Sequence, residues 1–202
     1  MTRLETISKY ITDNEKVLDV GCDQALLSRL LAKRGIYSIA SDLRSNIIEK
    51  AKEATPKPFL SYIDFRVGDG VTLKDNENNF TLVLAGMGAY TMLDILKNTD
   101  KRFDKIITIS NNNNDMLRKE MLKLKYKVSL EEIIKEKGKY YNLIVFLPGT
   151  TIYSEEETIV GVNHQNKGLL KEYNDYLIEK YSKITENKEL VKVVEILKNY
   201  TY

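Results

Sequence analysis

Short apolar runs alternate along the first half of the chain with stretches whose apolar residues recur every three or four positions. The runs predict buried β-strands, and the recurring pattern predicts helices between them. Strands that alternate with helices indicate right-handed crossovers and a parallel sheet covered on both faces. The predicted strands are Lys16–Val20, Tyr37–Ser41, Tyr62–Val67, Phe80–Ala85 and Lys105–Ile109.

Residues with short polar side chains stand where several of the predicted helices begin. Thr2 and Glu5 have the spacing of a capping box. Asp23 precedes an apolar-rich segment over residues 24–34, and Ser45 precedes another. We therefore expect Asp23 and Ser45 to be N-cap residues.

The alternation stops after residue 125, where two strand-like runs follow each other with no helix between them. These runs are Lys127–Lys135 and Tyr140–Leu147, and Lys137-Gly138 supplies the turn of a hairpin. The predicted fold class is α/β, with a mostly parallel seven-stranded sheet that ends in an antiparallel hairpin.

The last part of the chain predicts two amphipathic helices. Apolar residues fall at helical spacing over residues 169–184 and again over 190–197, which favours an antiparallel helical hairpin. A segment of this size cannot form a core alone, so we expect it to pack on the first domain or on a partner. We divide the chain into a first domain, 1–155, and a C-terminal helical hairpin, 156–202.

Composition excludes several kinds of chemistry. The chain has 202 residues, one cysteine and one histidine. It therefore has neither an internal disulfide framework nor a zinc site built from cysteines or several histidines, and we expect no metal. The first ten residues lack the apolar core of a signal peptide, and Leu143–Leu147 is too short to span a bilayer. We expect a cytoplasmic protein without a membrane partner.

Glycines and carboxylates follow four of the predicted strands. In a parallel sheet the carboxyl ends of the strands lie at one edge, and ligands bind at that edge. The first strand runs into Asp19, Gly21, Cys22 and Asp23, without the glycine pattern of a dinucleotide site. Asp42 ends the second strand, where a carboxylate can accept both ribose hydroxyls. Gly68-Asp69-Gly70 follows the third strand, and Asp69 is placed to accept from an adenine amine.

The fourth strand ends in Ala85-Gly86-Met87-Gly88, whose glycines leave room for close approach of a ligand to the backbone. Each of these four signals alone is also compatible with an ordinary turn. Together, at successive strand ends of one sheet, they favour a site for S-adenosylmethionine.

These strand-end motifs, together with Asn111 and Gly138-Lys139-Tyr140-Tyr141, resemble those of the TrmK-type tRNA adenine-N1 methyltransferases. The resemblance covers most of the chain. It implies a class I, Rossmann-like methyltransferase domain, a coiled-coil-like helical tail, and S-adenosylmethionine as cofactor. It also implies tRNA as partner and N1 of the adenine at tRNA position 22 as methyl acceptor. The chain departs from the family pattern at Cys22, Gln24, Ala89 and Ile109-Ser110.

The N1 lone pair of adenine is free at neutral pH, so this reaction requires positioning and exclusion of water rather than a strong base. We expect the catalytic slot to be shaped by Gly86, Met87, Gly88 and Asn111. The expected cofactor contacts are Asp19, Gly21, Cys22, Asp23, Asp42, Leu43, Asp69, Gly70, Ala85 and Gly86. The expected substrate contacts are Tyr90, Asn111, Arg118, Lys139 and Tyr141.

Several alternatives stay open at this point. The basic stretch 97–139 suits contacts with tRNA phosphates, but it is equally compatible with a solvated surface. Tyr90 and Tyr141 suit stacking on a base and also ordinary packing. A small-molecule methyltransferase and a non-catalytic protein-binding module are the competing functions, and we expect a monomer.

Overall fold

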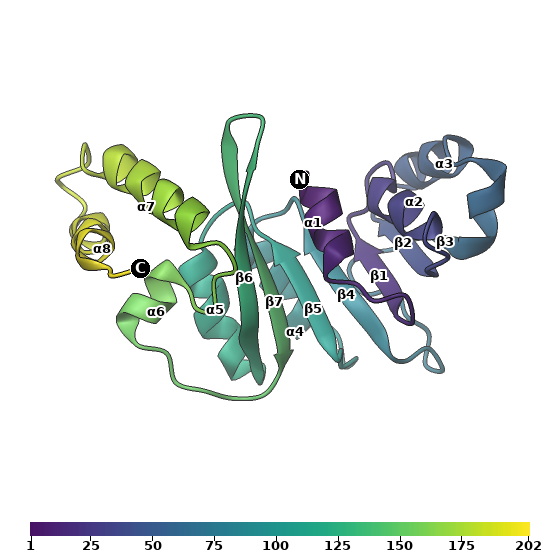
Figure 1. Cartoon of the computed structure of the whole chain (residues 1–202). Helices are drawn as coiled ribbons and strands as arrows, with labels where there is room; N and C mark the ends of the chain where they lie inside the picture. The colour runs from purple at the N-terminus through teal and green to yellow at the C-terminus, as the bar shows by residue number, and fades with distance from the viewer.

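A computed structural model describes all residues, 1–202, and contains one seven-stranded sheet with the strand order β3-β2-β1-β4-β5-β7-β6 (Figure 1). Strands β1 to β5 are parallel, β7 is antiparallel to β5, and β6 is antiparallel to β7. The strands are β1 Lys16–Val20, β2 Ser38–Asp42, β3 Ile63–Val67, β4 Phe80–Ala85, β5 Lys105–Ile109, β6 Tyr126–Glu136 and β7 Lys139–Pro148. The predicted fold class is confirmed.

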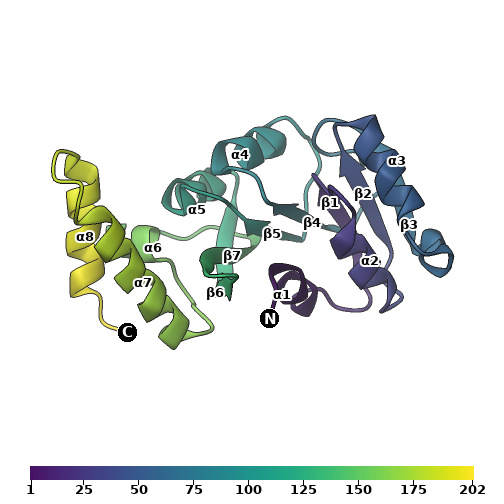
Figure 2. The same cartoon turned by 90° about the horizontal axis from the view of Figure 1, so that it is seen from above.

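Helices cover both faces of the sheet. Figure 2 shows α4 and α5 on one side and α1 on the other. The α4 and α5 face forms the largest apolar cluster, which includes Leu82, Met92 and Phe146, while α1 and α2 pack around Ile7, Leu31 and Val83. The helices are α1 Arg3–Lys9, α2 Leu26–Ala32, α3 Ser45–Glu53, the 3₁₀ helix η1 Lys57–Tyr62, α4 Ala89–Lys97, α5 Asn114–Lys123, α6 Glu155–Val160, α7 Lys167–Tyr181 and α8 Lys188–Asn199.

Capping was predicted correctly for one of three helices. The capping box of Thr2 and Glu5 is present. Asp23 is not an N-cap, because α2 begins only at Leu26 and Ala25 occupies the cap position in the left-handed region. Ser45 is the first residue of α3, and Arg44 stands at the cap position without a side-chain hydrogen bond. Helix α2 therefore begins later than predicted, and α3 begins one residue earlier.

The C-terminal helices α7 and α8 form the predicted helical hairpin and pack beyond the β6 edge of the sheet (Figure 1). Their small apolar cluster joins Leu170 and Leu197 to Ile133 of β6 and Val160 of α6. The expected packing of this segment on the rest of the chain is confirmed. Helix α6 was not predicted, and no helix is long and apolar enough to cross a membrane.

Candidate active site at the carboxyl edge of the sheet

The loops that follow β1, β2 and β3 are joined by backbone hydrogen bonds. The amides of Gly21 and Cys22 donate to the Ser41 carbonyl at 2.8 and 3.0 Å, and the Gly68 amide donates to the Asp42 carbonyl at 3.1 Å. Because β1, β2 and β3 are neighbouring parallel strands, these loops lie along one edge of the sheet. The predicted convergence of the strand ends on this side is therefore present.

The loops after β4 and β5 are joined in the same way. The Gly86 amide donates to the Ile109 carbonyl at 3.2 Å, and the Asn111 amide donates to the Met87 carbonyl at 3.0 Å. Asn111 Nδ2 also donates to the Gly86 carbonyl at 3.0 Å. The exposed Asn111 side chain therefore keeps Oδ1 as a free acceptor beside Gly86.

The backbone adopts left-handed conformations at several points of this edge. In the β1 loop, Gly21, Asp23 and Ala25 have φ values of 74°, 47° and 50°. A Cβ added to Gly21 lies 2.9 Å from Met87 Cε, so the β1 and β4 loops approach each other closely at this glycine. Left-handed non-glycine residues cost free energy and concentrate at functional sites. Aspartate tolerates this conformation better than most residues, whereas Ala25 carries no sequence signal for it.

Carboxylates dominate the β1 to β3 side of the edge. Asp19 is 6% exposed, its carboxylate accepts no hydrogen bond, and burial raises its pKa to about 7. Burial also raises the pKa of Asp42, but hydrogen bonds and charge from Arg44 outweigh it and hold the pKa below its usual value. Asp23 and Asp69 are exposed. Leu43, next to Asp42, is a large apolar residue that is 64% exposed at the same edge.

Arg66 on β3 fixes the loop that carries Asp69 and Gly70. Its guanidinium group forms salt bridges with Asp64 and Glu77, and Nη1 donates to the Thr72 carbonyl at 2.8 Å. Glu77 lies further along the same loop, and its pKa falls to about 2 chiefly because of the Arg66 hydrogen bond. Arg66 was missed by the sequence analysis, because a lone arginine in a strand has no motif.

The β4 to β7 side of the edge carries little charge near the strand ends. Gly86 is exposed, and a Cβ added to it would meet no atom within 4 Å, so the space in front of it is open. Ala85, Met87 and Gly88 are partly buried around it. Tyr90, near the start of α4, is 68% exposed, so a packing role for its ring is excluded by the structure.

Lys139 directly follows the turn of the β6–β7 hairpin, and Tyr141 lies two residues further along β7. The Tyr141 ring is partly buried and is covered by the guanidinium group of Arg3, whose carbon lies 4.3 Å from the ring centroid. Tyr141 therefore packs against α1, which agrees with the packing role that the sequence analysis left open for this residue. Lys139 is exposed and has no carboxylate partner.

Arg118 corrects the sequence analysis. Its side chain is buried, with a relative exposure of 1%, and it forms a salt bridge with the equally buried Glu131 of β6. Arg118 Nη1 also donates to the Thr158 carbonyl of α6 at 2.8 Å. The guanidinium group of Arg118 is therefore engaged inside the protein, and the prediction that it contacts the substrate is wrong. Arg118 instead joins α5, β6 and α6.

Many cations of the basic stretch 97–139 have partners within the protein. Seven of its twelve cations are bound inside the protein, five to carboxylates and two to backbone carbonyls: Lys97, Lys105, Arg118, Lys123, Lys135, Lys101 and Arg102. Carboxylates therefore neutralise five of the twelve positive charges of this stretch, and the other seven have no carboxylate partner.

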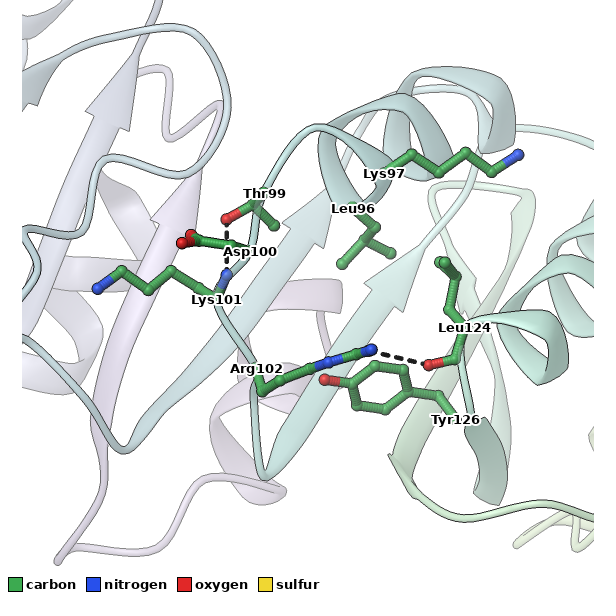
Figure 3. A pocket seen from close by; sticks show the side chains of 8 residues that line it. All are labelled: Leu96, Lys97, Thr99, Asp100, Lys101, Arg102, Leu124 and Tyr126. Carbon is green, nitrogen blue, oxygen red and sulfur yellow. Dashed lines mark hydrogen bonds between the residues drawn. The ribbon is translucent and has the colours of Figure 1, made fainter.

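A cavity of about 270 Å³ lies at the opposite, amino edge of the sheet, before the starts of β5 and β6. Figure 3 shows Arg102 pointing to the Leu124 carbonyl beside Tyr126. Lys97 and Lys101 in its wall are likewise bonded to Glu120 and to the Lys74 carbonyl. This cavity shares no residue with the strand-end loops, so it is not the site that those loops form.

Two negative observations limit the chemistry of the site. No group of three or more histidine, cysteine, aspartate or glutamate side chains is arranged to hold a metal ion. Cys22 is buried, and burial together with the charges of Asp19 and Asp42 raises the pKa of its thiol, so it is not an activated nucleophile. The site therefore offers positioning groups, without an activated thiol.

The sheet order, the strand-end loops and a family match define the class of protein. Residues 1–144 match the family model described as a methyltransferase domain. That range is 144 of 202 residues, and the chain therefore belongs to this methyltransferase family. No curated protein matches the chain.

Several solved structures resemble the chain over nearly its whole length. A protein of the NADB-Rossmann superfamily from Streptococcus agalactiae is 24% identical, with a TM-score of 0.88 and coverage of 98% of this chain and 95% of the other. TrmK of M. capricolum in complex with S-adenosyl-homocysteine is 22% identical, with a TM-score of 0.86 and coverage of 99% and 96%. The m1A22 tRNA methyltransferase TrmK of B. subtilis is 21% identical, with a TM-score of 0.72 and coverage of 98% and 94%. At these identities the likeness shows a shared fold that includes the C-terminal helices.

Proposed function

We propose that this methyltransferase transfers the methyl group of S-adenosylmethionine to N1 of an adenine in tRNA, at position 22 by similarity. The observation that carries the proposal is the division of one sheet edge into a carboxylate side and a side with open glycine backbone and Asn111. The full-length likeness to M. capricolum TrmK, whose structure holds S-adenosyl-homocysteine, supports it.

The residues present fit such a cofactor. Asp19 is a buried carboxylate without a hydrogen-bond partner, which is costly unless a cation binds beside it. Asp42 ends β2, where a carboxylate can accept from ribose hydroxyls, and Asp69 follows β3. In our assignment Asp19 serves the amino acid part, Asp42 the ribose, and Asp69 the adenine of the cofactor. When bound, the cofactor supplies a methyl group on a positively charged sulfur.

Asn111 and the Gly86 backbone are assigned to the target base. Asn111 Nδ2 is occupied by the Gly86 carbonyl, so Oδ1 remains to accept from the exocyclic amine of an adenine. That contact leaves N1 without a hydrogen bond and free to act as the nucleophile. The bases of a folded tRNA are stacked, so the target must be turned out of its stack to reach this edge. The exposed ring of Tyr90 is available to stack on it.

We also propose that the chain acts as a cytoplasmic monomer. The division into a methyltransferase domain, 1–155, and a helical extension, 156–202, is part of the same proposal. Size-exclusion chromatography with light scattering measures the oligomeric state; a mass of about twice 23.3 kDa contradicts the monomer.

The experiment that tests the function combines binding and turnover. Calorimetry with S-adenosylmethionine should show binding, and its absence favours a non-catalytic module. Labelled cofactor and unmodified bulk tRNA are then incubated with the enzyme, and the tRNA is digested to nucleosides. We expect the label in 1-methyladenosine. Binding of the cofactor without any label in tRNA points to a small-molecule substrate instead.

A further inference from the structure

The β6–β7 hairpin extends beyond the edge that carries the candidate active site. Pairing between β5 and β7 ends at Ile109 and Leu143, whereas pairing between β6 and β7 continues to Glu136 and Lys139. Four further residues at roughly 3.4 Å each place Lys139 about 14 Å beyond the end of β5. Figure 1 shows this arm projecting past the other strands, beside α7.

Tyrosine rings fill the contact between the arm and α7. The ring centroid of Tyr140 lies 5.7 Å from that of Tyr173 and 5.3 Å from that of Tyr176. Tyr173 is the more buried of the two partners of Tyr140, and burial raises the pKa of Tyr173 to about 12. Tyr176 is 43% exposed. The packing therefore holds the Tyr173 ring against the arm and leaves the Tyr176 ring exposed to solvent.

The cations around these rings differ in whether a carboxylate neutralises them. Lys135 forms a salt bridge with Glu172. Lys137, Lys139 and Lys180 are exposed and form no salt bridge, and Lys180 Nζ lies 5.9 Å from the centroid of the Tyr176 ring. The surface therefore keeps an excess of positive charge after its internal ion pairs are counted.

We propose that the arm surface, defined as Lys137, Lys139, Tyr140, Tyr176 and Lys180, binds the sugar–phosphate backbone of the tRNA and stacks an unpaired base on Tyr176. This inference rests on the proposed function. Uncompensated lysines beside exposed aromatic rings suit a polyanion with flat bases. The surface lies on the side of the sheet where the target adenine enters, so one RNA molecule reaches both. An acidic protein partner is the competing occupant.

The first test removes the free charges. The triple variant K137A/K139A/K180A is compared with K33A/K50A/K52A, which removes three exposed lysines, one at the C-cap of α2 and two in α3, that also lack salt bridges. Both variants lose the same net charge. Each lost phosphate contact lowers the slope of log affinity against log salt by about 0.7 to 0.9. For binding of unmodified tRNA, we expect the magnitude of this slope to be smaller by about two to three in the arm variant than in wild type, and unchanged in the control.

The second test concerns the ring. Tyr176→Ala should weaken tRNA binding about fivefold or more, whereas Tyr176→Phe keeps the ring and should bind like wild type. Cofactor affinity should stay unchanged in all of these variants. If the wild-type protein methylates tRNA but the arm and control variants show equal salt slopes for tRNA binding, the proposed role of the arm surface is overturned and the proposed function stands. A wild-type protein that neither binds nor methylates tRNA overturns the proposed function and this inference together.

Discussion

The two sides of the candidate active site differ in charge and in how they are built. On the β1 to β3 side, four carboxylates (Asp19, Asp23, Asp42 and Asp69) stand at or just after the strand ends. On the β4 to β7 side, the corresponding positions hold open glycine backbone, Asn111, Tyr90 and the free lysines of the arm. One edge of one sheet is therefore acidic at one end and neutral to basic at the other.

The difference matches two ligands of opposite charge. A cofactor that carries a sulfonium and an ammonium group is attracted by carboxylates, and RNA is repelled by them. Separating the two along the edge lets both bind while only the methyl group and the target base meet. In the proposed function the methyl group and the target base meet at the β1–β4 contact, where Gly21 faces Met87. The comparison predicts that changes on either side affect one ligand only.

The largest effect is expected from Asp42→Ala. A buried, charge-assisted hydrogen bond contributes about 1.5–3 kcal/mol, so affinity for S-adenosyl-homocysteine should fall roughly 10- to 100-fold. Calorimetry measures the affinity. Asp42→Asn keeps an acceptor for the Arg44 amide and tests whether the loop or the charge matters. Unchanged affinity in both variants removes Asp42 from the cofactor site.

Asn111→Ala sharpens the comparison from the other side. It removes the acceptor offered to the adenine amine and the bond to the Gly86 carbonyl, so kcat should fall about tenfold. The affinity for S-adenosyl-homocysteine should stay within about twofold of wild type. Single-turnover methylation of tRNA and calorimetry give the two values. If Asn111→Ala lowers only the cofactor affinity, the assignment of Asn111 to the target base is contradicted.

Arg66→Met should weaken cofactor affinity about fivefold, because the loop with Asp69 loses its attachment to β3. Arg34→Met is the matched control. Arg34 is bound as extensively, to Ser8, Ile11 and Asp13, but it touches none of the strand-end loops. Both variants should lose thermal stability, and only Arg66→Met should lose cofactor affinity. Equal affinities in the two variants contradict a positioning role for Arg66.

The last prediction concerns the pH dependence of stability and not the affinity for a ligand. The pKa of Asp19 is about 7 in the folded protein and lies near 3.8 in an unfolded chain, so the folded state binds the extra proton between these values. The stability of the cofactor-free protein should therefore fall as pH rises from about 4 to 7, relative to Asp19→Asn. Denaturant unfolding at several pH values measures this. Saturating S-adenosyl-homocysteine should reduce the slope. A wild-type slope in Asp19→Asn contradicts the assignment.

The regular elements were predictable because their signals are local. Strands β1, β4 and β5 have the predicted bounds, and Lys137-Gly138 forms the predicted turn with φ values of 49° and 76°. The order of glycines and carboxylates also placed the strand-end loops at one edge. These features depend on residues that are neighbours in the sequence.

Two of the errors, at Asp23 and Arg118, depend on contacts between distant residues. Asp23 is of a residue type that commonly caps helices, yet α2 begins only at Leu26. The reason is that the amides of Gly21 and Cys22 bond to the Ser41 carbonyl, which sets the course of the loop before α2. Arg118 belongs to a basic stretch, yet Glu131 withdraws it into the core. The free cations of the arm are distinguished only once the ion pairs of the fold are known. Charge in the sequence therefore did not predict charge on the surface.

The most direct test measures two affinities on the same three proteins: wild type, Asp42→Ala and K137A/K139A/K180A. The ligands are S-adenosyl-homocysteine and unmodified tRNA at low salt. We expect Asp42→Ala to lose affinity for the small ligand only, and the lysine variant to lose affinity for tRNA only, each by about tenfold or more. Variants that each lose affinity for both ligands to the same extent contradict a site divided by charge.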